Sequence, residues 1–235
     1  MMIDTKEPLS NIQCSTPSNF YGDARILLEG IIEEFLSCLH MIRRYQKETT
    51  GWDPVSSCTS RIKSPDSMKK KLIKDGFEPT PENALFHEHD AAGVRLICPM
   101  VDDVYQTAQL IRTIPGISVL HEKDFIAHPK PNGYRSYHMI VQMPLRFLGN
   151  SPQTRLASSL CLEIQLRTIA MDCWASIEHE LKYKHDIANP ELMQQELKRC
   201  SDQIASTDLS LSTLKELIHS PGRPEMTDAR KEDRS

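Results

Sequence analysis

The sequence predicts an α+β or α/β domain built around a β-sheet. Segments with apolar residues at helical spacing alternate with short runs that are typical of strands. Two of these runs, at residues 137–143 and 160–167, alternate strictly between the two sides of the chain, which favours strands with one buried face. A long regular segment near the C-terminus predicts an additional helix.

The composition fits one globular domain with polar ends. The chain has 235 residues, of which 39% are hydrophobic and 26% are charged, and its formal net charge is -4. This charge gives no overall attraction to nucleic acid or membranes, and no apolar run approaches the roughly 18 residues of a membrane span. The N-terminus lacks a signal pattern, so we expect a cytoplasmic protein. The seven scattered cysteines are interpreted as free thiols.

The first half of the chain predicts helices and strands in alternation. Residues 1–20 are polar and expected to be disordered, and residues 46–59 are interpreted as a connection. Between them, a helix from Asp23 has one apolar face. Residues 60–64 are expected to form a loop leading into a helix that Ser64 caps and Gly76 ends. A buried strand at 92–98, a helix at 102–114 and a short strand at 117–120 follow. The apolar helix face consists of Leu28, Ile31, Ile32, Phe35, Leu39 and Ile42.

The second half contains the two alternating strands and two helices. In the strand at 160–167, Glu163, Gln165 and Arg167 share the face opposite the apolar residues. A helix is expected at 168–184 and another from Pro190, where apolar positions recur at 4-3 spacing. That regular seam either packs on its own domain or joins a second copy of the chain. Residues 220–235 are expected to be disordered. The seam consists of Met193, Leu197, Cys200, Ile204, Thr207, Leu211, Leu214 and Ile218.

A dense group of cations occurs between residues 61 and 74. It is either a solvated helix face or a clamp for a polyphosphate, because repelling cations are tolerated when a multiply charged anion lies among them. A guanidinium such as that of Arg61 also stacks well on a nucleobase. The group consists of Arg61, Lys63, Lys69, Lys70, Lys71 and Lys74.

Two carboxylates on predicted strands are candidates for a metal site. Asp90 lies just before the strand at 92–98, and Glu163 lies within the strand at 160–167. Such a pair can hold Mg²⁺ through a few oxygens and leave positions for substrate phosphates. Gly93 permits close approach of a ligand, and Arg95 interrupts an otherwise apolar strand. The nearby histidines at 87 and 89 lack the spacing of a zinc site.

The segment from Lys123 to His138 concentrates hydrogen-bonding and stacking groups around "HPKPNGYRSYH". It is either a polar hairpin turn or a binding site for a second ligand that is phosphorylated and aromatic. In the second interpretation, Tyr134 offers a ring on which a purine can stack, and Gly133 supplies the turn. The candidate ligand contacts are Lys123, His128, Lys130, Asn132, Tyr134, Arg135 and His138.

Four blocks resemble the synthetase domain of RelA/SpoT-type enzymes, and most of all the small alarmone synthetases of the RelQ type. They are "SRIKS", "DAAGVRLIC", "KDFIAHPKPNGYRSYHMIV" and "EIQLRTIAMDCWASIEHELKYK", and the likeness covers about residues 25–210. The resemblance implies a nucleotidyltransferase-like fold with a mixed sheet flanked by helices. We therefore expect a synthetase domain at 21–186, a helical oligomerisation segment at 187–219 and a disordered tail at 220–235.

The same resemblance implies a reaction and assigns residues to it. The expected activity is that of a GTP pyrophosphokinase, which transfers the β,γ-pyrophosphate of ATP to the 3′-hydroxyl of GTP or GDP and yields AMP and the alarmones pppGpp or ppGpp. Asp90 and Glu163 are the expected Mg²⁺ ligands, with Glu163 also the expected base. The ATP contacts are expected to be Arg61, Lys63, Lys71, Lys74 and Arg95. The acceptor contacts are expected to be Lys123, Lys130, Asn132, Tyr134, His138 and Gln165, with Arg167 and Glu178 supporting them.

The resemblance also implies partners and leaves alternatives open. A homotetramer formed through C-terminal helices is expected, with an alarmone or RNA as a conceivable allosteric ligand, and synthesis without hydrolysis. One alternative is a nucleotide-binding or RNA-binding module without catalysis. Another is the same chemistry with an adenine nucleotide as acceptor. The paired carboxylates Asp90 and Glu163 favour an enzyme over a binding module, because a protein without catalysis has no need of a metal pair.

Overall fold

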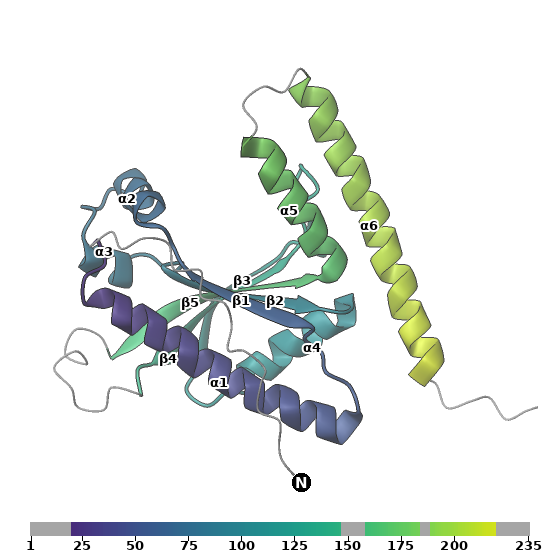
Figure 1. Cartoon of the computed structure of the whole chain (residues 1–235), viewed down its shortest axis with the longest axis horizontal. Coiled ribbons are helices and arrows are strands. Elements are labelled where there is room, and N and C mark those ends of the chain that lie inside the picture. Colours follow the sequence, from purple (N-terminus) through teal and green to yellow (C-terminus); the bar gives the residue numbers. More distant parts are fainter. Residues whose placement is uncertain (1–19, 147–157, 184–188, 220–235) are drawn as a thin grey trace, which may run out of the picture.

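The computed structural model describes residues 20–146, 158–183 and 189–219. It contains both helices and strands, as the sequence predicts (Figure 1). The expected disordered ends and the expected boundary at 186–187 lie outside the described residues. The helices are α1 (Ala24–Thr50), α2 (Pro65–Lys74), α3 (Pro81–Phe86), α4 (Val101–Arg112), α5 (Ile169–Tyr183) and α6 (Pro190–His219). The strands are β1 (Ser57–Ile62), β2 (Ala92–Cys98), β3 (Ser118–Asp124), β4 (Tyr137–Pro144) and β5 (Ser159–Thr168). Strands β3, β4 and β5 follow one another along the chain.

The strands form one mixed sheet in the order β1-β2-β5-β4-β3. Strands β2 and β5 run parallel, and every other neighbouring pair is antiparallel. The predicted α+β class with a mixed sheet is therefore confirmed. The parallel pair lies at the centre, which brings residues far apart in the sequence next to each other: Gly93 pairs with Glu163 and Arg95 with Gln165.

The hydrophobic core fills the side of the sheet that α1 and α4 cover (Figure 1). Strands β4 and β5 contribute every second residue to it, because successive side chains of a strand point to opposite faces. The predicted apolar face of α1 is buried from Leu28 to Leu39, and Ile42 is partly buried. This arrangement leaves the polar side chains of the central strands on the opposite face.

Two parts of the predicted connection and loop are wrong. Helix α1 continues to Thr50 and ends at Gly51, whose positive φ of 75° suits a helix C-cap. Residues 57–62, interpreted as connection and loop, form strand β1 at the sheet edge. This strand is polar because it is only half-buried along its length, so it lacks the apolar pattern by which strands are recognised.

The C-terminal helix α6 packs on α5 and α4 of its own chain (Figure 1). Its inward side is polar, with Ser201, Asp208 and Ser212 all buried. Of the predicted apolar seam, Met193, Leu197, Cys200 and Ile204 are half-buried, whereas Leu211 is 39% and Leu214 is 53% exposed. The C-terminal part of the seam is thus presented outward.

Candidate active site

The polar face of the sheet brings the two halves of the predicted site together across β2. Arg61 of β1 and Glu163 of β5 both pair with Gly93, one from each side. The Arg61 Nη2 atom lies 4.0 Å from Glu163 Oε2. A Cβ at Gly93 would lie 3.8 Å from both Arg61 Cγ and Glu163 Oε2, so any larger side chain there would stand between them. The absence of a side chain keeps this part of the face open.

The neighbouring row of the sheet carries the other polar residues of the prediction. Arg95 pairs with Gln165, Gln165 with His138, and His138 with Lys123. Gln165 Nε2 donates a hydrogen bond to Glu163 Oε2 at 3.1 Å. The predicted donor and acceptor contacts therefore lie on adjacent strands in two successive rows, as their register requires.

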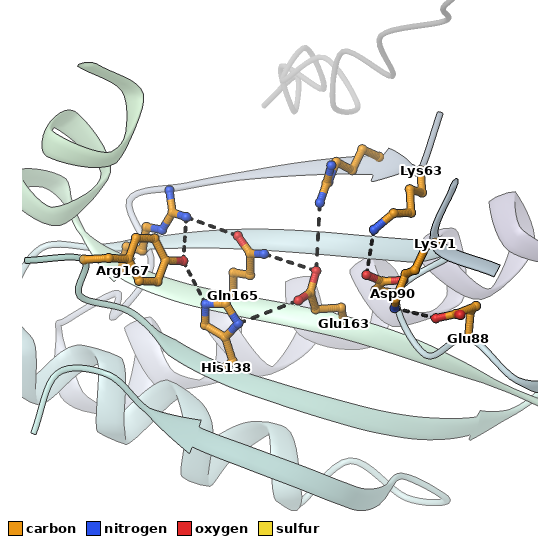
Figure 2. A network of polar contacts seen from close by, with 10 residues as sticks. Lys63, Lys71, Glu88, Asp90, His138, Glu163, Gln165 and Arg167 are labelled. Atoms are coloured by element: carbon orange, nitrogen blue, oxygen red, sulfur yellow. Dashed lines mark hydrogen bonds and ion pairs between the residues drawn. The ribbon is translucent and has the colours of Figure 1, made fainter. Parts of the chain in front are cut away.

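Asp90 is held by two lysines at the start of β2 (Figure 2). Lys63 Nζ lies 2.7 Å from Asp90 Oδ2, and Lys71 Nζ lies 2.9 Å from Asp90 Oδ1. Lys71 also forms an ion pair with Glu88, whose side chain is only 4% exposed. Lys63 comes from the end of β1 and Lys71 from α2, so three segments meet at Asp90.

The lysines determine the charge of Asp90. Burial alone would raise the pKa of this carboxyl, but hydrogen bonds and charges of Lys63 and Lys71 outweigh burial and lower the pKa. Burial would likewise lower the pKa of Lys71, while Glu88 and Asp90 raise it. Asp90 is therefore a carboxylate and Lys71 an ammonium at neutral pH.

Glu163 is also a carboxylate at neutral pH. Burial would raise its pKa, and the hydrogen bond and charge of His138 more than offset this and lower it. The charge of Asp90 acts on Glu163 in the raising direction, so the two predicted metal ligands are within electrostatic reach of each other. Figure 2 shows both on the same side of the sheet.

A cavity of about 710 Å³ opens beside Glu163 on the predicted ATP side. Arg61, Lys63 and Arg95 supply cations to its wall, and Gly93 and Glu163 form part of the floor where β2 meets β5. Ser64 and Ser67 add hydroxyl groups from the start of α2. Cations and hydroxyl donors around a hollow of this size suit a phosphorylated ligand.

A hydrogen-bonded chain links the predicted acceptor side to Glu163 (Figure 2). Arg167 Nη2 donates to the Tyr134 hydroxyl at 2.9 Å, and this hydroxyl lies 2.8 Å from His138 Nε2. On the opposite edge of the ring, His138 Nδ1 lies 3.6 Å from Glu163 Oε1. The His138 ring thus contacts the Tyr134 hydroxyl through Nε2 and faces Glu163 through Nδ1.

The loop before β4 is fixed by its own hydrogen bonds and by α5. Asn132 Oδ1 accepts from the backbone N–H of Tyr134 at 3.1 Å, and Asn132 Nδ2 donates to Glu178 at 3.1 Å. The ammonium of Lys130 lies 4.8 Å from the centre of the Tyr134 ring. A second hollow of about 390 Å³, lined in part by Arg95, Tyr134 and Glu178, lies beside this contact.

Two predicted residues lie apart from these contacts. Lys74, the last residue of α2, is exposed and neither contacts Asp90 nor lines the cavity beside Glu163. Lys123 shares the row of His138 but is exposed at the edge strand β3. Of the others, Arg61, Arg95, His138, Glu163 and Gln165 lie in the two rows of this face, and Tyr134 and Arg167 are joined to them by hydrogen bonds.

Sequence reasoning missed two acidic residues of the site. Glu88 pairs with Lys71, and Asp172 of α5 accepts from Arg167 at 2.9 Å and lies 3.5 Å from Arg95. The spacing of Glu88 and Asp90, two residues apart before a strand, was a usable signal for a shared side. No sequence signal identified Asp172, because its pairing depends on how α5 crosses the sheet.

Comparisons with known proteins identify the family of this chain. A family model described as a region found in RelA / SpoT proteins matches residues 60–188. The GTP pyrophosphokinase YwaC of Bacillus subtilis is 39% identical over 152 residues, which cover 65% of this chain and 70% of that protein. Among solved structures, small alarmone synthetase 2 of B. subtilis matches with a TM-score of 0.72 at 32% identity, covering 84% of this chain and 98% of that one.

A second solved structure, small alarmone synthetase 1 of B. subtilis bound to its product pppGpp, matches with a TM-score of 0.71 at 28% identity. The alignment covers 86% of this chain and all of that one. An open mixed sheet whose polar face carries Glu163 and a cation-lined cavity suits a protein of the nucleotide-binding class. Within that class, the chain belongs to the RelA/SpoT family.

In the part of the chain that the structure describes, no helix combines the length and apolar character needed to cross a membrane.

Proposed function

We propose that the chain is a GTP pyrophosphokinase, which transfers the β,γ-pyrophosphate of ATP to the 3′-hydroxyl of GTP or GDP. The observation that carries this proposal is the position of Glu163. It lies between the cation-lined cavity of Arg61, Lys63 and Arg95 and the hydrogen-bonded chain that begins at Tyr134. The relatives support the same activity. YwaC is named as a GTP pyrophosphokinase, and the neighbouring structure is a small alarmone synthetase bound to its product pppGpp.

The cation-lined cavity is the ATP side in this proposal. Arg61 and Arg95 present guanidinium groups to the hollow, and guanidinium planes stack on adenine. Lys63 and Lys71 converge at Asp90, where they can turn toward phosphate oxygens. Lys74 has no support from the geometry as a phosphate contact, although its long side chain lies on the same helix as Lys71.

The loop of Tyr134 is the acceptor side. Its ring can stack on guanine. The Lys130 ammonium lies over the ring, and Asn132 accepts a hydrogen bond from the Tyr134 backbone N–H. His138 and Gln165 both contact Glu163, so they set the position of the carboxylate relative to an incoming hydroxyl. This arrangement brings acceptor recognition and the reacting group onto neighbouring strands.

Glu163 is the proposed general base. The 3′-oxygen of the acceptor forms a bond to the β-phosphorus of ATP, the bond from that phosphorus to the α–β bridging oxygen breaks, and AMP leaves. The proton of the 3′-hydroxyl passes to the Glu163 carboxylate. The lowered pKa of Glu163 keeps it ionised and able to accept a proton, at the cost of a smaller driving force for the transfer.

The donor set of this site fits Mg²⁺. Asp90 and Glu163 are both ionised, and Mg²⁺ in proteins is usually bound by one or two carboxylates together with water and substrate phosphates. No group of three or more His, Cys, Asp or Glu side chains suited to a metal occurs among residues 20–146, 158–183 and 189–219. Asp90 and Glu163 would hold the ion, which when bound neutralises phosphate charge and weakens its repulsion of an incoming oxygen.

The outward stripe of α6 supports a proposed homotetramer. Leu211 and Leu214 occupy the predicted seam and are exposed on a helix that already packs on its own domain. Regular apolar residues on an exposed helix face suit contact with another helix. Leu214→Glu should therefore reduce the mass found by sedimentation, whereas Ser206→Glu, at an exposed position of the same helix outside this stripe, should leave it unchanged. An unchanged mass in both variants would contradict assembly through this stripe.

The activity is tested by product analysis with a matched pair of variants. Purified protein is incubated with ATP, labelled GTP and Mg²⁺, and the products are separated by thin-layer chromatography. Glu163→Gln should lower turnover by about 10²–10⁴-fold with the thermal unfolding midpoint unchanged, since it removes the base and retains the shape. Glu82→Gln, on the exposed side of α3, should behave as the wild type. Nucleotide binding without any 3′-pyrophosphorylated product in the wild type would refute the proposed function.

A further inference from the structure

The turn that carries Tyr134 lies against the C-terminal helix of the same chain. Gly133 is buried and has a positive φ of 93°. A Cβ built on it would lie 2.7 Å from Ser201 Cβ and 3.4 Å from Lys198 Cα, both in α6. A contact of 2.7 Å between carbon atoms forces one of them to move, so only glycine allows the turn to approach the helix this closely.

A buried hydrogen bond joins the two segments at this point. The Ser201 hydroxyl donates to the Gly133 carbonyl oxygen at 2.5 Å, and the Ser201 residue is only 2% exposed. The next residue of the helix, Asp202, lies 3.5 Å from the Arg135 guanidinium. Two consecutive residues of α6 therefore contact the residues on either side of Tyr134. A buried hydrogen bond of this kind holds its partners because losing it would leave a buried carbonyl without a donor.

Helix α6 is itself anchored to the domain on both sides of Ser201. The Trp174 indole donates to the Leu197 carbonyl at 2.8 Å, and the Thr168 hydroxyl donates to Asp208 at 2.7 Å. Thr168 and Asp208 are both buried, so their hydrogen bond is protected from water. These anchors lie one turn before and two turns after Ser201. The helix is thus a fixed support behind the turn.

The other side of the turn is fixed by α5, through the hydrogen bond from Asn132 to Glu178. Residues 130–134 close on themselves as well, because the Gly133 N–H donates to the Lys130 carbonyl at 2.8 Å. The position of the Tyr134 ring over the polar face is therefore set by α5 on one side and by α6 on the other. Ser201 is the α6 residue that contacts the turn most closely.

We propose that α6 positions the acceptor loop, with Ser201 as a positioning residue for acceptor binding. Ser201 touches neither substrate in this proposal; it acts through Gly133 and the Tyr134 ring that follows. The inference rests on the proposed function, because it assigns the guanine nucleotide to this loop. It gives α6 a role within a single chain that is separate from any role of its outward stripe in assembly. A support that acts on the acceptor loop alone should affect one substrate and spare the other.

Steady-state kinetics of Ser201→Ala provides the test. We expect the acceptor KM to rise about 3- to 10-fold, as the loss of one hydrogen bond worth about 1 kcal/mol implies, while the KM for ATP stays within about 2-fold. Ser206→Ala, an exposed serine of the same helix, is the matched control and should retain both constants. Equal changes in the two KM values, or an acceptor KM that matches the control, would overturn the proposal.

A second variant tests the same contact from the side of the loop. Gly133→Ala introduces both the steric conflict with Ser201 and an unfavourable φ, so its acceptor KM should exceed that of Ser201→Ala. An acceptor KM equal to that of the wild type in a folded Gly133→Ala protein would overturn the proposal too. Failure of the proposed function would be recognised separately, because the wild type itself would then form no product. The ratio of the acceptor KM in a variant to that in the wild type tests only the role of α6.

Discussion

Replacing Tyr134 tests the acceptor side most directly. The Tyr134 ring lies 5.2 Å from the Arg167 guanidinium carbon and 4.8 Å from the Lys130 ammonium, measured to the ring centre. Its hydroxyl bonds with Arg167 and His138. Tyr134→Ala removes the ring and the hydroxyl together, whereas Tyr134→Phe removes the hydroxyl alone. The two variants therefore separate stacking from hydrogen bonding.

The expected magnitudes differ between the two variants. Stacking of a base on an aromatic side chain contributes roughly 1–3 kcal/mol, which corresponds to a rise in the acceptor KM of about 5- to 140-fold for Tyr134→Ala. Tyr134→Phe keeps the ring, so its acceptor KM should rise much less. It should lower kcat instead, because the hydroxyl no longer fixes the Nε2 side of His138, whose Nδ1 faces Glu163.

The assay is initial-rate kinetics with ATP saturating and GTP varied, followed by the converse. The ATP KM should change little in either variant, since the cavity beside Arg61 and Lys63 does not include Tyr134. An unchanged acceptor KM in Tyr134→Ala would reject the stacking role. A Tyr134→Phe variant as weak in acceptor binding as Tyr134→Ala would show that the hydroxyl, and not the ring, recognises the acceptor.

Two further predictions concern stability. Burial would raise the pKa of Asp53, but hydrogen bonds and charge from Arg43 lower it overall, so its stabilisation is present above the unfolded pKa and is lost as the pH falls through the folded pKa. Asp53→Asn should therefore flatten the loss of unfolding free energy below about pH 4 in urea titrations, and an unaltered pH profile would contradict this. Lys215→Met leaves the fully buried Asp103 without its ammonium partner at 2.5 Å and should destabilise the fold by about 3–5 kcal/mol. Adding Asp103→Asn should recover much of that loss; a double variant no more stable than the single one would argue against a buried charge as the cause.

The central strands and their polar face were predictable from the sequence. Strict alternation in β4 and β5 identifies which side chains face the core, because a strand has a period of two. It follows directly that Glu163, Gln165 and Arg167 share a face. The proximity of Asp90 to Glu163 did not follow from alternation. It depends on the parallel pairing of β2 with β5, which local pattern does not encode.

Other parts could not be predicted, for identifiable physical reasons. Strand β1 is a half-buried edge, so neither of its faces is consistently apolar. In α6 the buried stripe is made of polar residues such as Ser201 and Asp208, whose partners come from distant segments. A pattern of apolar residues detects the seam of this helix, which runs from half-buried Met193 to exposed Leu214, and not the buried polar stripe. Tertiary hydrogen bonds, which have no period in the sequence, decide which side faces inward.

The balance of charge around Asp90, Glu88 and Glu163 explains why a metal cation should bind together with ATP. Asp90, Glu88 and Glu163 are linked by ion pairs to Lys63, Lys71 and Arg61, so this group has no net charge. A triphosphate would bring several negative charges into it. If Lys63 and Lys71 pair with the phosphates, they must turn away from Asp90. The partly buried Asp90 carboxylate then loses its counter-ions. In the proposed function, a dication held by Asp90 and Glu163 would resolve both difficulties, because it would neutralise the carboxylates and leave Lys63 and Lys71 to contact phosphate oxygens. Glu88, nearly fully buried, meanwhile keeps Lys71 within reach of the site.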